Sequence, residues 1–313
     1  MIWITGAKGM LGRHLTEILL ENDQNPICTD KDVDIGNVDS IESFYNNIHH
    51  NKNTNSNMQK RDSRIEYIIN CAAYTAVDKA EEEKELNWNI NCIGPGQLAK
   101  FCSRKKITLI HISTDYVFSG DNQEGYSEDN ETNPLSEYGR SKLAGENNIV
   151  KNLKDYYIIR TSWLYGPYGN NFVKTMLKLF KQKSILNIIN DQYGSPTYTG
   201  DLANTIIKLI QRKSDFGIYH FSNSEKTNWY EFAKKILLDG QQYLTKHTFD
   251  LKINPIKSFQ FPQVAKRPKY SFLKTEKIES LLPYSIRPWP FALNDFFKDF
   301  YKKLEEELYS IPK

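Results

Sequence analysis

The sequence predicts an α/β fold: a Rossmann-like doubly wound parallel sheet with a smaller α/β lobe toward the C-terminus. Short apolar segments such as residues 1–5 and 108–113 alternate with longer stretches of helical character, and strands that alternate with helices form parallel sheets. A glycine-rich loop directly after the first strand is also typical of such sheets. The alternation fades beyond Tyr165. We therefore divide the chain into a sheet domain, residues 1–165, and residues 166–313, which form mainly the lobe with some segments returning to the sheet.

Composition limits the class of protein. Apolar residues make up 39% of the 313 residues, and the formal net charge is +3 with acidic and basic residues interspersed. The chain is therefore globular, and without a basic face we expect no nucleic-acid partner. No apolar run is long enough to cross a membrane and no secretory leader precedes the first strand, so we expect no membrane association and a cytoplasmic location.

The four cysteines show no metal-binding or disulfide pattern. Cys28, Cys71, Cys92 and Cys102 include no C-x-x-C pair. We expect reduced thiols, no disulfide framework and no metal site. Cys28 and Cys71 fall in predicted strands, where a thiol packs as a small apolar side chain.

A glycine loop follows the first strand. Gly6-Ala7-Lys8-Gly9-Met10-Leu11-Gly12 comes directly after the apolar residues 1–5, and a helix is predicted to run on to Glu21. Strand, glycine loop and helix together are the setting of a phosphate-binding turn. Gly6 permits the turn, Gly9 lets a pyrophosphate approach, and Gly12 lets helix and strand pack closely. A plain strand-to-helix turn would need one glycine rather than three.

The second predicted strand, residues 26–29, ends at Asp30. A carboxylate at this position can accept hydrogen bonds from the adenosine ribose hydroxyls of a dinucleotide. Lys31 follows directly and would instead favour a 2′-phosphate. NADH and NADPH therefore both stay open as cofactors.

The next segment is predicted to be a helix followed by an insertion. Asp34 or Asp39 is expected to cap a helix over residues 40–48. Residues 49–64 are rich in Asn, Lys and Ser and lack apolar periodicity. We interpret them as a solvated low-complexity insertion without chemistry.

Two strand ends carry small or polar residues. The strand over residues 66–70 leads into Cys71-Ala72-Ala73-Tyr74-Thr75, and the strand over residues 108–113 leads into Thr114. Parallel sheets bind ligands at the carboxyl ends of their strands. Small residues there let a flat ligand lie close, and Thr114 can hydrogen-bond a substrate carbonyl. A strand that simply leads into a helix cap would explain the first segment equally well.

Tyr138 and Lys142 are the predicted centre of the chemistry. They stand four residues apart in a predicted helix over residues 136–147, which places both side chains on one face. A phenol has a pKa of about 10, and a neighbouring ammonium lowers that pKa. The pair is therefore predicted to be a proton donor suited to reducing a carbonyl. The same spacing is common on solvated helix faces, so the prediction also depends on the glycine loop and on Thr114.

The second half of the chain is predicted to be mostly helical and is rich in aromatic residues. We expect a strand over residues 217–221 and helices over residues 171–183, 199–211, 227–238 and 294–307. The Trp, Tyr and Arg residues in this half are interpreted either as core or as a clamp for a nucleotide-linked ligand.

Taken together, the glycine loop, Ser113-Thr114-Asp115 and Tyr138-x-x-x-Lys142 resemble the motifs of the extended short-chain dehydrogenase/reductases. Four longer stretches are similar to the members of that family that reduce 4-keto dTDP-sugars: residues 70–81, 113–120, 160–165 and 190–197. The resemblance covers nearly the whole chain outside the insertion. It implies an oxidoreductase with NADPH or NADH as cofactor and a dTDP-sugar as substrate, with a homodimer as one possible assembly. It also implies that the sheet domain binds the cofactor and the lobe binds the substrate.

The resemblance assigns roles residue by residue. The implied catalytic triad is Thr114, Tyr138 and Lys142. The implied cofactor site is Gly6, Gly9, Met10, Leu11, Gly12, Asp30, Asp34, Ile35, Ala72, Ala73, Tyr74, Thr75, Tyr138 and Lys142, and the implied substrate site is Thr114, Asp115, Tyr116 and Trp163. Tyr138 would protonate the alkoxide formed at C4 of the sugar, Lys142 would lower the pKa of Tyr138 and hold the nicotinamide ribose, and Thr114 would orient the carbonyl.

Trp163 is expected to form a wall of the sugar pocket. The resemblance places a substrate-contacting Trp at this position. We also expect Tyr165-Gly166-Pro167, which follows it, to be an exposed loop.

Proteins with related sequences have three other functions that must be compared with a reductase. A related dehydratase would carry an acid after Asp115, where this chain has Tyr116, and this difference argues against dehydration. An epimerase uses the same triad with a trapped cofactor and stays open. A non-enzymatic regulator similar to the methionine adenosyltransferase beta subunit keeps similar motifs, but the intact triad and residues 191–197 favour an enzyme.

Overall fold

The computed structural model describes residues 1–53, 64–241 and 251–309. The first half of the chain forms β1 (Ile2–Thr5), α1 (Met10–Glu21), β2 (Ile27–Cys28), α2 (Val38–Asn53), β3 (Tyr67–Asn70), η1 (Lys79–Glu81), α3 (Lys84–Trp88), η2 (Asn89–Ile93), α4 (Gly94–Lys105), β4 (Thr108–Thr114), η3 (Asp115–Val117), α5 (Glu137–Asn152) and β5 (Tyr156–Thr161). The second half forms β6 (Leu164–Tyr165), α6 (Phe172–Gln182), β7 (Ile185–Ile189), β8 (Tyr193–Gly194), β9 (Thr197–Tyr198), α7 (Thr199–Arg212), β10 (Gly217–His220), β11 (Thr227–Asn228), α8 (Trp229–Gly240), β12 (Lys252–Ile256), η6 (Ser258–Gln260), α9 (Glu276–Glu279) and α10 (Trp289–Tyr309).

Six parallel strands form the central sheet, in the order β10-β5-β4-β3-β1-β2. The chain moves from β1 outward to β2 and then returns to the other side of β1 for β3. The gap between the ends of β1 and β3 is therefore the switch point at which parallel sheets bind ligands. This sheet confirms the predicted fold class.

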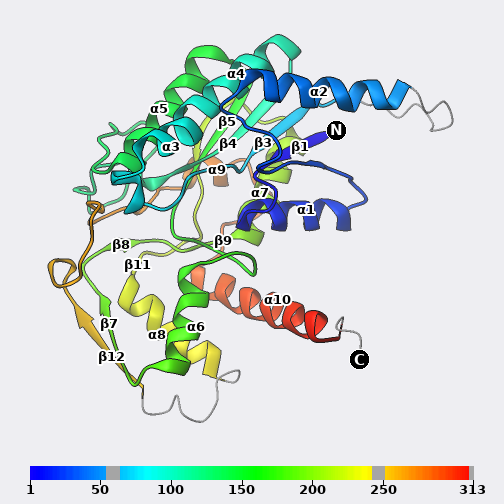
Figure 1. Ribbon diagram of the computed structural model, residues 1–313. Coiled ribbons are helices and arrows are strands. Elements are labelled where there is room, and N and C mark those ends of the chain that lie inside the picture. The colour runs from blue at the N-terminus through cyan, green and yellow to red at the C-terminus, as the bar shows by residue number, and fades with distance from the viewer. Residues whose placement is uncertain (54–63, 242–250, 310–313) are drawn as a thin grey trace.

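Helices cover both faces of the sheet. Successive side chains of β1 point to opposite faces, so Trp3 packs in one buried cluster with α2, α4 and α5, and Ile4 packs in another with α1 and α7. Figure 1 shows these two layers, with α2, α4 and α5 on one side of the sheet and α1 and α7 on the other.

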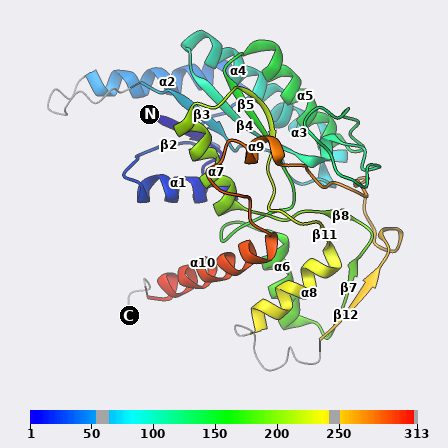
Figure 2. The same cartoon turned by 180° about the vertical axis from the view of Figure 1, so that it is seen from behind.

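A third buried cluster forms the core of the lobe. It joins α6, α8 and α10 through aromatic side chains such as Phe180, Phe232 and Phe296. β7 and β12 pair in parallel beside these helices, and Figure 2 shows this part below the sheet. α7 and β10 also come from the second half of the chain, but they pack on the sheet and extend it. No helix among the described residues is long and apolar enough to span a membrane.

The cap of α2 differs from the prediction. Asn37 caps this helix, because its Oδ1 accepts hydrogen bonds from the backbone N–H groups of Asp39 (2.9 Å) and Ser40 (3.4 Å). Asp34 instead accepts the N–H of Gly36 within its own turn (2.9 Å). The prediction of Asp34 or Asp39 as the cap is therefore wrong.

Two further predictions for the first half need correction. α2 continues to Asn53, so the start of the expected insertion, residues 49–64, is helical, while residues 54–63 lie outside the described part. Cys28 is exposed and its Sγ lies 3.4 Å from Thr16 Oγ1. It is therefore not packed as an apolar side chain, because β2 lies at the edge of the sheet.

A buried charged pair fastens α5 to the sheet. Nη2 of Arg160 on β5 donates to Oε2 of Glu146 on α5 at 2.7 Å, and both side chains are at most 4% exposed. Oγ of Ser113 on β4 also donates to Glu146. The Arg160 guanidinium in turn lies over the ring of Phe118, 5.2 Å from its centroid. The helix that carries Tyr138 and Lys142 therefore has one defined position over β4 and β5.

Removing one member of this pair should be strongly destabilising. Arg160→Met leaves the carboxylate of Glu146 buried without its cation, and such a change typically costs about 3–5 kcal/mol of unfolding free energy. Lys234→Met is the matched control, because its pair with Glu231 on α8 is about half exposed and such pairs contribute roughly 1 kcal/mol or less. Urea unfolding of both variants measures the difference, and equal losses would contradict the structural role of Arg160.

Candidate active site

The glycine loop lies at the switch point of the sheet. Gly6 has φ +65°, and a Cβ there would lie 2.5 Å from the backbone nitrogen of Ala72 after β3. A Cβ on Gly12 would lie 2.4 Å from the Gly6 oxygen. Any residue larger than glycine would therefore clash with the backbone at Gly6 and at Gly12, which explains two of the three glycines.

The start of α1 suits an anion. Gly9 precedes the helix without a side-chain capping bond, and no acidic residue lies in the first turn. The first N–H groups of a helix have no partner within it, so those of Met10 and Leu11 can donate to a ligand. These donors and the positive end of the helix fit a pyrophosphate.

A cavity of about 880 Å³ extends from this loop along α1 and the end of β2. Asp30 lines it, with its backbone N–H held by Asp32 Oδ1 at 2.6 Å. Lys8, Arg13 and Lys31 line the same cavity. Arg13 is not among the predicted site residues, although its place one helical turn after Gly9 was a usable signal. The cavity thus combines an acid suited to ribose hydroxyls with three cations suited to a 2′-phosphate.

The segment after β2 places Asp34 and Ile35 differently. Asp34 is exposed in a turn, whereas Ile35 is buried in the core cluster under α4. A Cβ on Gly94 would lie 2.7 Å from Ile35 Cδ1. The side chain of Ile35 is therefore part of the core, and only its backbone is left to face a dinucleotide.

The segment after β3 is held in an extended path by Asn91 on η2. Its Oδ1 accepts the N–H of Tyr74 and its Nδ2 donates to the Tyr74 oxygen, both at 2.9 Å. The Tyr74 hydroxyl donates to Glu83 at 2.7 Å. Ala72, Ala73 and Tyr74 are partly exposed beside Gly6, and Thr75 is exposed. These residues form a ledge at the switch point.

Two of the three predicted catalytic residues, Thr114 and Tyr138, lie together at the end of β4. Thr114 is buried there, and its side chain lies close enough to the Tyr138 phenol to lower the pKa of that phenol. α5 approaches closely because a Cβ on Gly139 would lie 2.3 Å from the Tyr116 oxygen. The Tyr116 ring packs edge-on against Tyr138, with centroids 5.7 Å apart. Lys142 is buried one turn further along α5.

The electrostatics of Tyr138 differ from the prediction. Burial raises the pKa of Tyr138 to about 12, opposed by the hydrogen bond with Thr114 and reinforced by Asp115. We expected Lys142 to lower this pKa, but its ammonium points to the sheet, where Nζ donates to the Ile112 oxygen at 2.6 Å. The expected direction is therefore wrong for the structure described here. Burial also lowers the pKa of Lys142 to about 8, with Glu146 and Cys71 opposing.

Asp115 is a buried acid with spare hydrogen-bonding capacity. Burial raises its pKa to about 7, while hydrogen bonds from Ser271 and Thr114 oppose that shift. Its Oδ2 has no hydrogen-bond partner among the described residues. A buried oxygen of this kind is suited to accept or donate a hydrogen bond to a ligand hydroxyl.

Tyr116 is linked to a loop of the second half that was not predicted in detail. Its side chain lies close to that of Arg267, and Arg267 forms a two-point ion pair with Asp78 at 3.0 and 2.6 Å. Asp78 also accepts the N–H groups of Val264 and Ala265. The loop that follows β12 is thereby tied to the ligand edge of the sheet. The aromatic and basic composition of this half was the only signal for such a link.

Trp163 lies between the sheet and the lobe. Its φ is +46°, and its indole stacks on Trp229 of α8 with centroids 3.6 Å apart and planes at 10°. It is partly exposed, whereas Tyr165, Gly166 and Pro167 are buried. The expected exposed loop is therefore wrong, because the Tyr165 ring belongs to the core of the lobe. Trp229 has no signal in the sequence that marks it as a partner of Trp163.

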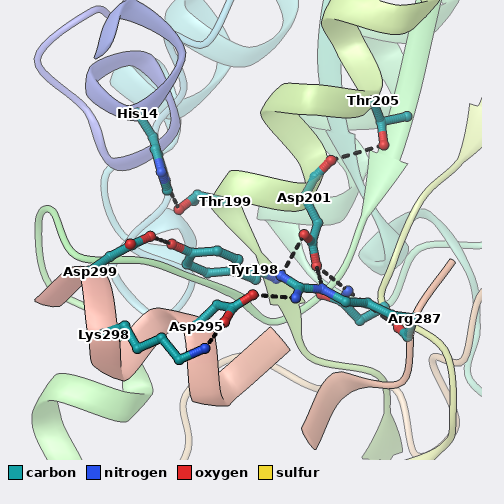
Figure 3. A network of polar contacts seen from close by, with 10 residues as sticks. His14, Tyr198, Thr199, Asp201, Thr205, Arg287, Asp295, Lys298 and Asp299 are labelled. Atoms are coloured by element: carbon teal, nitrogen blue, oxygen red, sulfur yellow. Dashed lines mark hydrogen bonds and ion pairs between the residues drawn. The ribbon is translucent and has the colours of Figure 1, made fainter. Parts of the chain in front are cut away.

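A second polar cavity, of about 290 Å³, lies between α1, α7 and α10. Figure 3 shows its contacts: Arg287 pairs with Asp201 (2.7 Å) and with Asp295, Tyr198 donates to Asp299, and His14 Nδ1 lies 2.7 Å from Thr199 Oγ1. It contains none of the predicted site residues. Because its charged groups pair with one another, we interpret it as a structural joint between the helices.

A dinucleotide-type glycine loop at the switch point, beside a Thr, Tyr and Lys constellation, is the arrangement of a short-chain dehydrogenase/reductase. The chain belongs to the family described as RmlD substrate binding domain, whose model matches residues 1–302. This result confirms the resemblance seen in the motifs.

Individual relatives can be aligned with this chain over nearly its whole length. The dTDP-4-dehydrorhamnose reductase of Aggregatibacter actinomycetemcomitans is 36% identical over 299 residues, which are 93% of this chain and 96% of that protein. The crystal structure of a dTDP-4-dehydrorhamnose reductase from Clostridium acetobutylicum ATCC 824 superposes with a TM-score of 0.83 at 40% identity, covering 95% of this chain and 98% of that one. A Bacillus anthracis dTDP-4-dehydrorhamnose reductase in complex with NADP superposes with a TM-score of 0.84 at 38% identity, with the same coverage.

The buried acid in the site predicts a pH dependence of stability. The pKa of Asp115 is about 7 in the folded protein and about 3.9 in an unfolded chain. Between these values the folded state holds a proton that the unfolded state has lost, so the free energy of unfolding falls as pH rises through this window. Asp115→Asn should lack this contribution. Urea unfolding between about pH 4.5 and 7.5 should therefore show wild type losing stability relative to Asp115→Asn, and a constant difference would contradict the raised pKa.

Proposed function

We propose that this chain reduces the C4 carbonyl of dTDP-4-dehydro-L-rhamnose to give dTDP-L-rhamnose, with NADPH or NADH as the reductant. It is an oxidoreductase of dTDP-rhamnose biosynthesis, which supplies polysaccharide synthesis. The observation that carries the proposal is the Tyr138 phenol beside Thr114, at the same edge of the sheet as the glycine loop, in a chain that matches the family from residue 1 to 302. A cytoplasmic location and a homodimeric assembly belong to the same proposal.

The cofactor residues follow from the site described above. The N–H groups of Met10 and Leu11 hold the pyrophosphate, and Asp30 with Lys8 and Lys31 holds the adenosine ribose and its 2′ substituent. The ledge formed by Ala72 to Thr75 lies along the rest of the dinucleotide. When bound, the nicotinamide supplies the hydride that reduces the carbonyl.

Tyr138 is the proton donor for the carbonyl oxygen. With a pKa of about 12, its phenol stays protonated at neutral pH, and an alkoxide is a stronger base than a phenolate. Thr114, which lies beside Tyr138, orients the carbonyl toward the same proton. The buried ammonium of Lys142 lies one turn further along α5 and donates to the Ile112 oxygen, and its charge is suited to holding the nicotinamide ribose.

The nucleotide sugar is held by side chains from both halves of the chain. Asp115 and Tyr116 come from the end of β4, and Trp163 comes from the end of β5. Arg267, linked to Tyr116, carries a charge suited to a diphosphate. The stacked pair of Trp163 and Trp229 offers a flat apolar surface to one side of the sugar.

Substituting the proton donor tests the proposal. Tyr138→Phe removes the only acid that we place at the carbonyl oxygen, and a general acid typically contributes about 10²–10⁴-fold to the rate. We expect kcat to fall by that factor and the Kd for NADPH to stay the same, measured by NADPH absorbance and by fluorescence titration. Tyr157→Phe is the matched control, because this β5 hydroxyl bonds the Ser214 oxygen outside the site. Near-normal turnover by Tyr138→Phe would remove Tyr138 from the chemistry.

A further inference from the structure

A buried histidine lies directly beneath Lys142. His111 is on β4, is fully buried, and joins two side chains through its ring nitrogens. Nδ1 lies 3.0 Å from Asn70 Nδ2, and Nε2 lies 3.2 Å from Lys142 Nζ. His111 is not among the predicted site residues, and no part of the proposed reaction uses it.

The orientation of the Asn70 amide is fixed by its neighbours. The backbone N–H of Ala72 can only donate, and it lies 3.1 Å from Asn70 Oδ1. The Thr5 hydroxyl donates to the same oxygen at 2.8 Å. The amide nitrogen of Asn70 therefore faces His111, and Nδ1 of His111 accepts its hydrogen bond.

The position of the histidine proton follows from this contact. Burial, together with the nearby Lys142, lowers the pKa of His111 well below its ordinary value, so the ring is neutral and carries one proton. Because Nδ1 is an acceptor, that proton is on Nε2 and points at the nitrogen of Lys142.

A fixed N–H donor beside an ammonium has consequences for Lys142. An ammonium cannot accept this hydrogen bond, whereas a neutral amine can. The other groups that face Lys142 are the Ile112 oxygen at 2.6 Å, Glu146 one turn along α5, and the Cys71 thiol after β3. Glu146 favours the charged lysine, and the N–H of His111 opposes it.

We propose that His111 is a positioning residue for the reaction: held by Asn70 and Thr5, its Nε2–H directs the Lys142 ammonium toward the Ile112 carbonyl and makes its proton easier to lose. The consequence for catalysis rests on the proposed function, in which Lys142 must be charged. Loss of that charge then sets the upper pH limit of activity, and Tyr138, with its higher pKa, does not.

The tautomer of His111 can be measured without any turnover. The structure supplies an internal control, because buried His220 has the opposite arrangement: its Nδ1 lies 3.1 Å from the Tyr126 oxygen and its Nε2 faces Arg160 at 3.4 Å. Nitrogen-15 NMR from about pH 6 to 9 should show that neither of these two histidines titrates. One, lost in His111→Gln, should be the Nε2–H form, and one, lost in His220→Gln, should be the Nδ1–H form. A Nδ1–H or doubly protonated His111 would overturn the proposal.

The pH profile of the reductase tests the effect on Lys142. In His111→Gln an amide oxygen can face the ammonium, so the alkaline limb of kcat/KM should move up by roughly one pH unit. His220→Gln should leave the limb in place while carrying a similar buried substitution. A folded His111→Gln with an unmoved limb would make His111 merely structural and would overturn the proposal. If His111→Gln does not fold, the tautomer of His111 in the wild-type spectrum tests the proposal, with His220→Gln used to identify the signals of His220. Absence of turnover in wild type would refute the proposed function and would leave the tautomer test standing.

Discussion

The buried contact of Glu146 with Arg160 and Ser113 is the constraint on which the site depends. A carboxylate and a guanidinium without access to water are stable only in direct contact, so α5 has one position relative to β4 and β5. Thr114 follows Ser113 on the strand, and Tyr138 lies two helical turns before Glu146. The position of Tyr138 beside Thr114 is thus fixed by a buried ion pair that does not itself contact either residue.

The site itself is assembled from three separate parts of the chain. The glycine loop and the ledge after β3 meet across the switch point because β1 and β3 are adjacent strands. Two of the contacts that attach the lobe differ in their chemistry: one is the Arg267–Asp78 ion pair, and the other is the stacked pair of indoles of Trp163 and Trp229. The substrate side of the site is therefore built by residues that are far apart in sequence.

Local rules were sufficient to predict much of this architecture. The glycine loop, the strands that end at Asn70, Thr114 and Thr161, and the helix of Tyr138 follow from spacing and apolar alternation. The pairing of β7 with β12 does not, because each strand is short and is stabilised by a partner more than sixty residues away. The cap of α2 was missed because Asn37 and Asp34 are both good caps, and only the backbone path selects between them.

The electrostatics of the site could not be predicted from spacing. Helical spacing does place Tyr138 and Lys142 on one helix face, but the direction of the lysine depends on the Ile112 carbonyl and on His111, which belong to a different element. Burial then raises the pKa of the phenol more than Thr114 lowers it, and the nearby charge of Asp115 raises it further. The burial of Tyr165 could not be predicted from its local sequence either, because this residue belongs to the aromatic core of the lobe rather than to an exposed loop.

Transfer of a labelled hydride tests the central claim most directly. The protein is incubated with dTDP-4-dehydro-L-rhamnose and NADPH that carries deuterium at the transferred position, and the sugar nucleotide is analysed by mass spectrometry and NMR. If the site reduces the carbonyl, one deuterium appears at C4 of dTDP-L-rhamnose for each NADPH consumed. Binding of NADPH without any label in the sugar would indicate a regulator, and a changed sugar without net cofactor consumption would indicate an epimerase. Either result would contradict the assignment of a reductase.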